Sequence, residues 1–446
     1  MSTPLFSAID RLRRQGFSRF HTPGHKGRDC GFLTPVTPWD FTEVRGADSL
    51  FEASGPIAET EARCTALYRT GGTFLSAGGS TLCIQAMLAL VRPLGGKLLL
   101  GRNAHASAIK TMALLDLRPV WLAQDLAPDG FPAPVTPAQV EAALAAGGDY
   151  AGVYVTSPDY FGRLTDIAGL AEVCHRYGVP LLVDNAHGAE LFFTGENRHP
   201  MALGADLCCD SLHKTLPVLT GGALLHVGAT PLAEKYGFAG RAKEAMGLFG
   251  STSPSYLILL SMDQLLPALE NGEMAAALAR DAEKVAGLAE LAKSRGFGLP
   301  QGPVLPTRLT LGFGAMGCTE AAFDAALTAH RVEPEYLAGH ACVFLCGGAS
   351  EEDFARLRRL IEELPAGPAL PLPDPLPQPE TVLSPRAALF ARRERVPLAA
   401  AGGRISAATV SRCPPGVPLL CPGERITAAA LAAAKGYGLE ELEVVR

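Results

Sequence analysis

The chain lacks a long uninterrupted hydrophobic run. Its nearest candidate, residues 74–91, is broken by serines, glycines, a threonine and a glutamine, whereas a membrane-spanning helix needs about 18 or more apolar residues. This stretch suits a loop that runs into a buried helix. Arg11, Arg13 and Arg14 lie near the start without an apolar run after them, so we expect no secretory leader. These absences predict a protein without a membrane partner.

The cysteines lack the spacing of a metal site or a disulfide framework. There are 11 of them, an odd number, and no Cys-x-x-Cys pair occurs although Cys208 and Cys209 are adjacent. In a long chain without a leader, this pattern favours free buried thiols in a reducing compartment. We therefore expect a cytoplasmic protein with no metal site.

An excess of basic residues is also missing. The 39 basic and 45 acidic residues give a net charge of −6, whereas nucleic-acid binders are normally basic, so no nucleic-acid partner is expected. Hydrophobic residues make up 48% of the chain and charged residues 19%, which allows a large core and excludes disorder of the whole chain. A length of 446 residues predicts two or three domains.

Between residues 60 and 227, short apolar runs alternate with helical stretches. The expected buried strands are 97–100, 119–122, 152–156, 180–183 and 223–226, and the expected helices are 81–91, 104–115, 137–146 and 167–177. This alternation predicts an α/β fold with a mostly parallel sheet and helices on both faces. Ligands bind at the carboxyl ends of the strands in such sheets, so the residues that follow each strand are the place to look for chemistry.

The composition divides the chain into five expected parts. They are an N-terminal arm (1–45), a large domain (46–295), a small α/β domain (296–364), a proline-rich linker (365–380) and a C-terminal segment (381–446). The arm is rich in turn-forming residues and is expected to run extended over other structure. Residues 255–295, rich in Ala, Leu, Glu and Lys, are expected to form one long helix.

Two residues at expected strand ends point to one cofactor. Asp184 ends an apolar run, and Lys214 follows another run that ends near Cys209. Taken singly, Asp184 suits a cap or turn and Lys214 a solvated surface position. Together they match the needs of pyridoxal phosphate, whose aldehyde takes a lysine as a Schiff base and whose pyridine nitrogen is kept protonated by an acid.

A glycine loop and a histidine complete the pattern. The loop 76–81 (Ser-Ala-Gly-Gly-Ser-Thr) opens an expected helix, whose N–H groups could bind a phosphate, although Ser80 could equally be a plain N-cap. His105 could stack on a flat cofactor ring or could be an ordinary polar residue at a helix start. The order of glycine loop, His105, Asp184 and Lys214 is that of fold-type I pyridoxal-phosphate enzymes.

Further motifs extend over most of the chain. They are 20–27 (Phe-His-Thr-Pro-Gly-His-Lys-Gly), 40–43, 157–158 with 160–162, 183–189 (Val-Asp-Asn-Ala-His-Gly-Ala), 211–217 (Ser-Leu-His-Lys-Thr-Leu-Pro), 251–254, and 414–420 with 422–424. On these motifs the sequence resembles the Orn/Lys/Arg decarboxylases, a family of bacterial basic amino-acid decarboxylases, in the short form without an N-terminal wing domain.

The resemblance implies a fold, a reaction and a set of residues. It implies a fold-type I large domain with a seven-stranded sheet that binds pyridoxal phosphate, a smaller C-terminal α/β domain, and a homodimer or higher oligomer. The implied reaction converts arginine, lysine or ornithine to its amine and CO₂, in polyamine metabolism. Implied site residues are Lys214 for the Schiff base, Asp184 for the pyridine nitrogen, His105 and Ala186 for the two ring faces, His187 beside them, and Gly79, Ser80, Thr81, Ser211 and His213 for the phosphate, with Ser251 or Thr252 reaching a phosphate in the partner subunit. Lys214 or His213 would return the proton.

Departures from the family pattern leave the substrate open. Asn185, Glu190, Gly221 and Cys413 stand where the family usually has Glu, His, Gln and Tyr, and Ala77-Gly78-Gly79 replaces Asn-Gly-Thr. The acid that would meet the distal cation of the substrate could be Glu43, Asp159, Glu190 or Glu424.

Two other interpretations stay open. One is another fold-type I enzyme, an aminotransferase or carbon–sulfur lyase, with Arg404 available to an α-carboxylate. The other is a family member without turnover, which would have no need for an activated amine.

Overall fold

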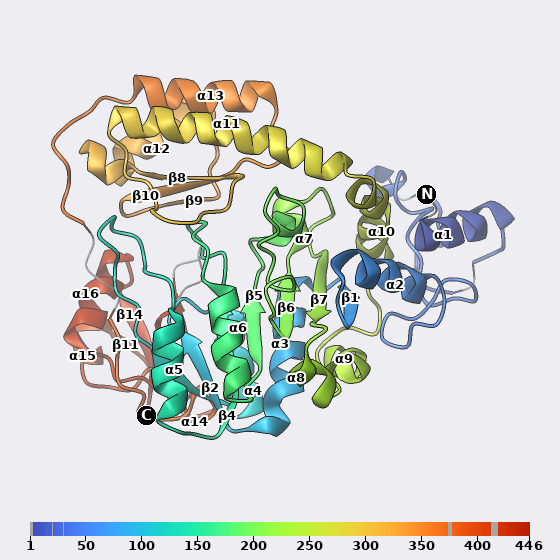
Figure 1. Cartoon of the computed structure of the whole chain (residues 1–446), viewed down its shortest axis with the longest axis horizontal. Helices are drawn as coiled ribbons and strands as arrows, with labels where there is room; N and C mark the ends of the chain where they lie inside the picture. The colour runs from blue at the N-terminus through green and yellow to red at the C-terminus, as the bar shows by residue number, and fades with distance from the viewer. Residues whose placement is uncertain (1–2, 20, 30, 373–376, 412–417) are drawn as a thin grey trace. The chain divides into compact units, whose positions relative to one another are not determined.

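The computed structural model describes residues 3–19, 21–29, 31–372, 377–411 and 418–446 (Figure 1). Phe20, the departure at Cys413, and residues 414–417 of the motif 414–420 lie outside these ranges. Among the helices that the structure describes, none is long and apolar enough to span a bilayer. The chain divides into two compact units, the first of residues 1–91 and 180–277 and the second of residues 92–179 and 278–446.

A seven-stranded sheet has the order β1-β7-β6-β5-β4-β2-β3. Its strands are β1 (Gly72–Ser76), β2 (Lys97–Gly101), β3 (Arg118–Leu122), β4 (Tyr150–Thr156), β5 (Leu181–Asp184), β6 (Leu207–Asp210) and β7 (Ala223–Val227). β7 runs antiparallel to both β1 and β6, whereas β2 with β3, β2 with β4 and β5 with β6 are parallel. The expected mostly parallel α/β fold is therefore confirmed.

The first unit contains the glycine loop and the lysine motif. Its helices are α1 (Pro4–Gln15), α2 (Pro56–Tyr68), α3 (Gly79–Val91), α7 (Leu212–Thr215), α8 (Pro231–Lys235), α9 (Phe238–Gly247) and α10 (Tyr256–Glu270), with 3₁₀ turns at Gly31–Leu33 and Ala189–Phe192. α3 packs against β1, β6 and β7. Its residues from Leu82 onward are almost all buried, because a helix that is apolar on every side belongs inside a core.

Two expectations need correction. Residues 1–45 were expected to form an extended arm, yet residues 4–15 form α1, a helix whose buried face includes Leu5 and Ile9 and which packs on α2 and α10. The long helix expected over 255–295 is two helices, α10 and α11 (Glu273–Arg295), separated at Asn271 and Gly272. Gly272 has a φ of +82°, which ends the first helix because only glycine adopts this left-handed backbone readily.

The second unit holds the remaining elements. Its helices are α4 (Ala106–Leu115), α5 (Pro137–Ala145), α6 (Ile167–Arg176), most of α11, α12 (Glu320–His330), α13 (Glu351–Glu363), α14 (Pro385–Leu389), α15 (Leu398–Ala401) and α16 (Ala428–Gly436), with 3₁₀ turns at Arg92–Leu94 and Phe313–Met316. Beyond β2, β3 and β4, its strands are β8 (Arg308–Gly312), β9 (Tyr336–Ala338), β10 (Ala341–Leu345), β11 (Arg393–Pro397), β12 (Val410–Ser411), β13 (Pro418–Leu420) and β14 (Glu441–Val445).

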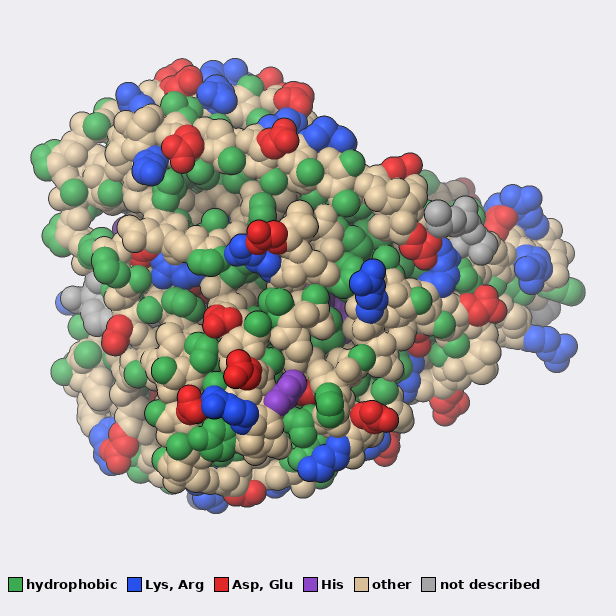
Figure 2. Space-filling model, in the orientation of Figure 1, with side chains coloured by type: hydrophobic (Ala, Val, Ile, Leu, Met, Phe, Trp, Pro, Cys, Tyr) green, Lys and Arg blue, Asp and Glu red, His purple; other side chains and the backbone are tan. Residues whose placement is uncertain are grey.

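Two smaller cores lie within the second unit. α11, α12 and α13 cover one face of the three-stranded sheet β8-β10-β9 and share a core with it (Figure 1). The visible outer surface of these helices carries both acidic and basic side chains (Figure 2). Along α13, Arg356 forms an ion pair with Glu352. The second core joins α15 and α16 to β13 and to β14, which pairs with β11.

Candidate active site

The strands of the first unit bring three carboxyl ends to one edge of the sheet. β5 and β6 are parallel, and Asp184 pairs with Cys209 in their register. β1 and β6 both run antiparallel to β7, and their last residues, Ser76 and Asp210, lie opposite the first two residues of β7. The segments that follow β1, β5 and β6 therefore begin at the same edge, where parallel-sheet enzymes bind their ligands.

The glycine loop at this edge leads directly into α3. Gly79 has a φ of +66°, and its N–H donates to the carbonyl of Gly221 at 2.8 Å. α3 begins at Gly79, so Ser80 and Thr81 lie in its first turn and the interpretation of Ser80 as a plain N-cap is wrong. Thr81 is exposed and Ser80 half-buried. Because the first N–H groups of a helix lack intrahelical acceptors, this turn is suited to an anion.

Asp184 is a buried carboxylate at the end of β5. Only 2% of the residue is exposed. Its Oδ1 accepts the N–H of Ala186 at 3.1 Å, and the Cys209 thiol donates to the same oxygen at 3.5 Å. Ala186 is also buried. Its assignment to one face of a flat cofactor ring stays a prediction.

Lys214 lies on α7, the single helical turn that follows β6. Its Nζ is 3.0 Å from Nε2 of His187, a residue of the segment that follows β5. This contact joins the segments after β5 and β6. Lys214 is half-buried.

Ser211 and His213 flank the lysine. Ser211 is fully buried, and its Oγ is 3.3 Å from Nδ1 of His213. The N–H of Gly221 donates to the same Nδ1 at 3.3 Å. Gly221 thus contacts both the glycine loop and the lysine segment. Its φ of +98° favours glycine, and a Cβ there would lie 3.3 Å from the carbonyl oxygen of Ala77.

The remaining residues expected to contact the cofactor are His105, Ser251 and Thr252. His105 belongs to the second unit, where it is the N-cap of α4 and its Nδ1 accepts the N–H of Ser107 at 3.2 Å. Ser251 and Thr252 are exposed in the turn before α10. Their assignments to the cofactor ring and to the partner's phosphate stay predictions.

The four acids considered for the substrate's distal cation have different surroundings. Glu43 is exposed, and Glu190 is buried in the 3₁₀ turn after β5. Glu424 is fully buried and forms an ion pair with Arg102. Asp159 is buried, which raises its pKa to about 6 even though the N–H of Arg163 donates to it at 2.8 Å.

Arg404, the residue considered for an aminotransferase, is used within the C-terminal segment. It donates to the carboxylate of Glu394 at 2.7 Å and to the carbonyl of Val445 at 3.0 Å. These contacts favour a packing role for Arg404.

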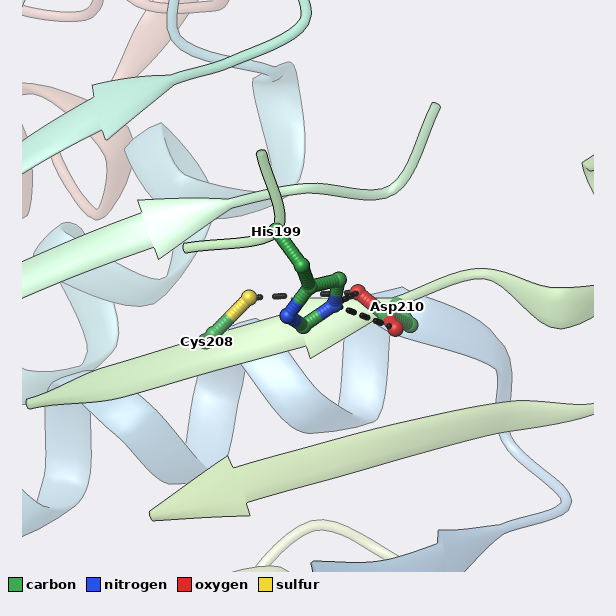
Figure 3. Close-up of side chains that lie close together, drawn as sticks. All are labelled: His199, Cys208 and Asp210. Carbon is green, nitrogen blue, oxygen red and sulfur yellow. Dashed lines mark hydrogen bonds and ion pairs between the residues drawn. The ribbon is translucent and has the colours of Figure 1, made fainter. Parts of the chain in front are cut away.

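A buried polar cluster beneath the site was not predicted. Figure 3 shows His199 pointing at the carboxylate of Asp210, the last residue of β6, with Cys208 of the same strand beside them. His226 of β7 donates to the same carboxylate at 3.1 Å. Burial alone opposes ionisation, but the two imidazoles hold the pKa of Asp210 below its usual range. The irregular spacing of these residues gave no signal in the sequence, because only the sheet topology brings them together.

This cluster has the donor types of a metal site. Ligand atoms of His199, Cys208 and Asp210 lie within 4.8 Å of one another. However, each nitrogen of both imidazoles has a hydrogen-bond partner, since the Nδ1 atoms of His199 and His226 contact Met201 N and Thr73 Oγ1. Hydrogen bonds therefore account for the cluster without an ion.

The residues at the sheet edge fit pyridoxal phosphate in their chemistry. A lysine amine, a buried strand-end carboxylate, a small residue two positions after Asp184 and an open helix start are all present within one unit. A Cβ on Gly79 would meet nothing within 4 Å, so the loop backbone is open to a bound group. This donor set matches what the cofactor requires.

Comparison with known proteins agrees with this chemistry. The model of the Orn/Lys/Arg decarboxylase major domain matches residues 3–281, and that of the C-terminal domain matches residues 375–436. The uncharacterized protein YaaO of Bacillus subtilis is 31% identical, over 96% of this chain and 92% of its own length. An arginine decarboxylase of Halalkalibacterium halodurans is 30% identical, with the same two coverages.

A solved structure shows the same fold. The lysine decarboxylase of Francisella novicida superimposes with a TM-score of 0.80 at 16% identity, covering 100% of this chain and 81% of that chain. The family resemblance seen in the sequence motifs is confirmed, and the chain belongs to the Orn/Lys/Arg decarboxylase family.

Proposed function

We propose that the protein is a pyridoxal-phosphate-dependent decarboxylase that converts arginine, lysine or ornithine to the corresponding amine and CO₂. One observation carries this proposal. In a chain of this family, Asp184 is the last residue of β5 and Lys214 lies in α7, directly after β6. Relatives named arginine decarboxylases that match nearly the whole chain support the reaction type.

Different residues of the first unit would bind different parts of the cofactor. Lys214 Nζ would bind the cofactor covalently, and Asp184 would hold a proton on its ring nitrogen. Ser80, Thr81 and the N–H groups of α3 would bind the phosphate together with Ser211. When bound, pyridoxal phosphate supplies an electron sink for the electron pair left as the carboxylate departs.

Other residues would control protons and water. His187 Nε2, 3.0 Å from Lys214 Nζ, can exchange a proton with the amine. Lys214 or His213 would deliver a proton to the substrate's α-carbon. Asp184 is buried, so its surroundings would keep water from the bound cofactor on that side, and a dry site would favour loss of a charged carboxylate.

The substrate's distal cation calls for an acid, and Glu424 is a poor candidate because it already neutralises Arg102. We further propose that the active unit is a cytoplasmic homodimer, in which exposed Ser251 or Thr252 contacts the phosphate held by the partner subunit. The amine product would enter polyamine metabolism.

Release of carboxyl carbon tests the proposed reaction. Arginine, lysine and ornithine, each labelled in the carboxyl carbon, are supplied to the purified protein with pyridoxal phosphate, and evolved gas is trapped. Labelled CO₂ is expected from at least one of them. It should disappear in Lys214→Ala and persist in Lys293→Ala, which removes an exposed lysine at the end of α11.

The same assay distinguishes the other interpretations. Transfer of the amino group to a keto acid without labelled CO₂ would make the protein an aminotransferase. An absence of both reactions would support a family member without turnover.

A further inference from the structure

A side-chain hydrogen bond joins the ends of β5 and β6 beneath the proposed cofactor site. Asn185 Nδ2 donates to Asp210 Oδ1 at 2.7 Å, and both residues are fully buried. Asn185 lies directly after Asp184, and Asp210 lies directly before Ser211. The bond therefore connects the two segments that the proposed function assigns to the cofactor.

Two histidines fix the carboxylate side of this bond. His199 Nδ1 accepts the N–H of Met201 at 3.3 Å, so its proton lies on Nε2, which donates to Asp210 Oδ2 at 2.9 Å (Figure 3). His226 Nε2 donates to the same oxygen at 3.1 Å. Asp210 thus accepts N–H groups from three side chains, which stabilises a buried anion in a single orientation.

As long as residue 210 is an aspartate, position 185 needs an amide and not a carboxylate. An acid at position 185 would face Asp210 across the same 2.7 Å, and two buried carboxylates at that distance do not both ionise. An amide at position 210 alone would offer one acceptor oxygen to three N–H donors. One acid and one amide must therefore occur together, one after β5 and one at the end of β6.

We propose that Asn185 and Asp210 are a matched pair of positioning residues, whose hydrogen bond holds the Asp184 and Lys214 segments in the arrangement that binds pyridoxal phosphate. This inference rests on the proposed function. Neither residue is assigned a contact with the cofactor, so both act through the segments that they join.

Single substitutions should weaken cofactor binding. Asp210→Asn leaves one neutral acceptor oxygen for three N–H donors, and Asn185→Asp places two carboxyl groups together. In each variant the dissociation constant for pyridoxal phosphate should rise about 10- to 100-fold, as expected for loss of a buried charge-assisted hydrogen bond. The measurement is a titration of cofactor-free protein, followed by the visible absorbance of the bound cofactor.

The double substitution Asn185→Asp with Asp210→Asn separates pairing from general damage. The amide introduced at position 210 can accept from the histidines through its oxygen and donate to the acid introduced at position 185. If the two single effects were independent, their fold-changes in the dissociation constant would multiply. The double variant should bind pyridoxal phosphate at least about fivefold more tightly than this product predicts.

Thr73→Val is the matched control in the same cluster. Thr73 Oγ1 contacts His226 Nδ1 at 2.9 Å on β1, on the side of the histidine away from Asp210. This change should lower the thermal midpoint of the cofactor-free protein but keep the dissociation constant within about threefold of the parent, since it does not touch the β5–β6 bond.

The outcomes distinguish the two proposals. If the parent protein binds pyridoxal phosphate and the single variants bind it equally well, the positioning role is wrong and the proposed function stands. The pairing would also be refuted if the two single effects simply multiplied in the double variant. It would likewise be refuted if Thr73→Val lost as much affinity for pyridoxal phosphate as the single variants do. A parent protein that does not bind pyridoxal phosphate would overturn the proposed function and this inference together.

Discussion

Glu424→Gln should destabilise the second unit rather than change the substrate. Arg102 Nη2 donates to Glu424 Oε2 at 2.8 Å, and a second N–H of Arg102 donates to Oε1. The N–H of Cys421 donates to Glu424 at 2.7 Å, and the guanidinium lies 4.7 Å from the centre of the Trp121 ring. The Cys421 N–H and the Trp121 ring therefore both contact the bidentate ion pair of Arg102 with Glu424.

The burial of both side chains determines how much stability Glu424→Gln should lose. Arg102 is 4% exposed and Glu424 is 0% exposed, so a glutamine would leave the arginine's charge buried without a counter-charge. Breaking such a pair typically destabilises a protein by about 3–5 kcal/mol, whereas an exposed pair contributes about 0–1 kcal/mol. At about 2–4 °C per kcal/mol, the thermal midpoint should fall by at least about 6 °C.

Thermal unfolding of Glu424→Gln and Glu394→Gln provides the assay. Glu394 is the matched control, because its ion pair with Arg404 is about one-third exposed on both sides. Its loss should shift the midpoint by about 4 °C or less. If Glu424→Gln keeps the parent's midpoint but changes the preference among arginine, lysine and ornithine, Glu424 is the substrate's acid and the reasoning from Arg102 is refuted.

Three further predictions concern the site and its surroundings. Asp184→Asn should keep the cofactor but lose on the order of 10²–10³ in rate, and activity within a few-fold of the parent would make Asp184 structural. Mixing Lys214→Ala protomers with protomers altered at Ser251 and Thr252 should restore partial activity if sites are shared in a dimer, whereas no recovery after verified subunit exchange would place these residues in one protomer's site. Burial raises the pKa of Asp159 to about 6, so its ionisation opposes folding as the pH rises from 4 through 6. Asp159→Asn should therefore gain stability relative to the parent over this range, by roughly 3 kcal/mol, and a pH-independent difference between the two unfolding curves would contradict it.

Apolar runs in the sequence located five of the seven strands of the large sheet to within two residues. The strand expected at 97–100 is β2, Lys97–Gly101, and that expected at 152–156 is β4, which begins two residues earlier at Tyr150. β1 was missed, since Gly72–Ser76 is short and was taken as part of a loop. It forms a strand because it pairs antiparallel with β7, a long-range contact that no local pattern reports.

Those site residues that lie next to strand ends could be predicted from the sequence. Asp184 and Lys214 each follow an apolar run, so position alone placed them at the same edge. The hydrogen bond between Asn185 and Asp210 was not predictable, because it depends on the register of β5 against β6. The prediction of one long helix overlooked Asn271-Gly272, a turn signal at the point where α10 ends and α11 begins.

Covalent labelling of the cofactor lysine tests the central claim most directly. The purified protein is incubated with pyridoxal phosphate, reduced with borohydride, digested and mapped by mass spectrometry. The account predicts that the reduced cofactor is found on Lys214 and that Lys214→Ala carries none. Label on a different lysine, or no label on a folded protein, would contradict the assignment of the site.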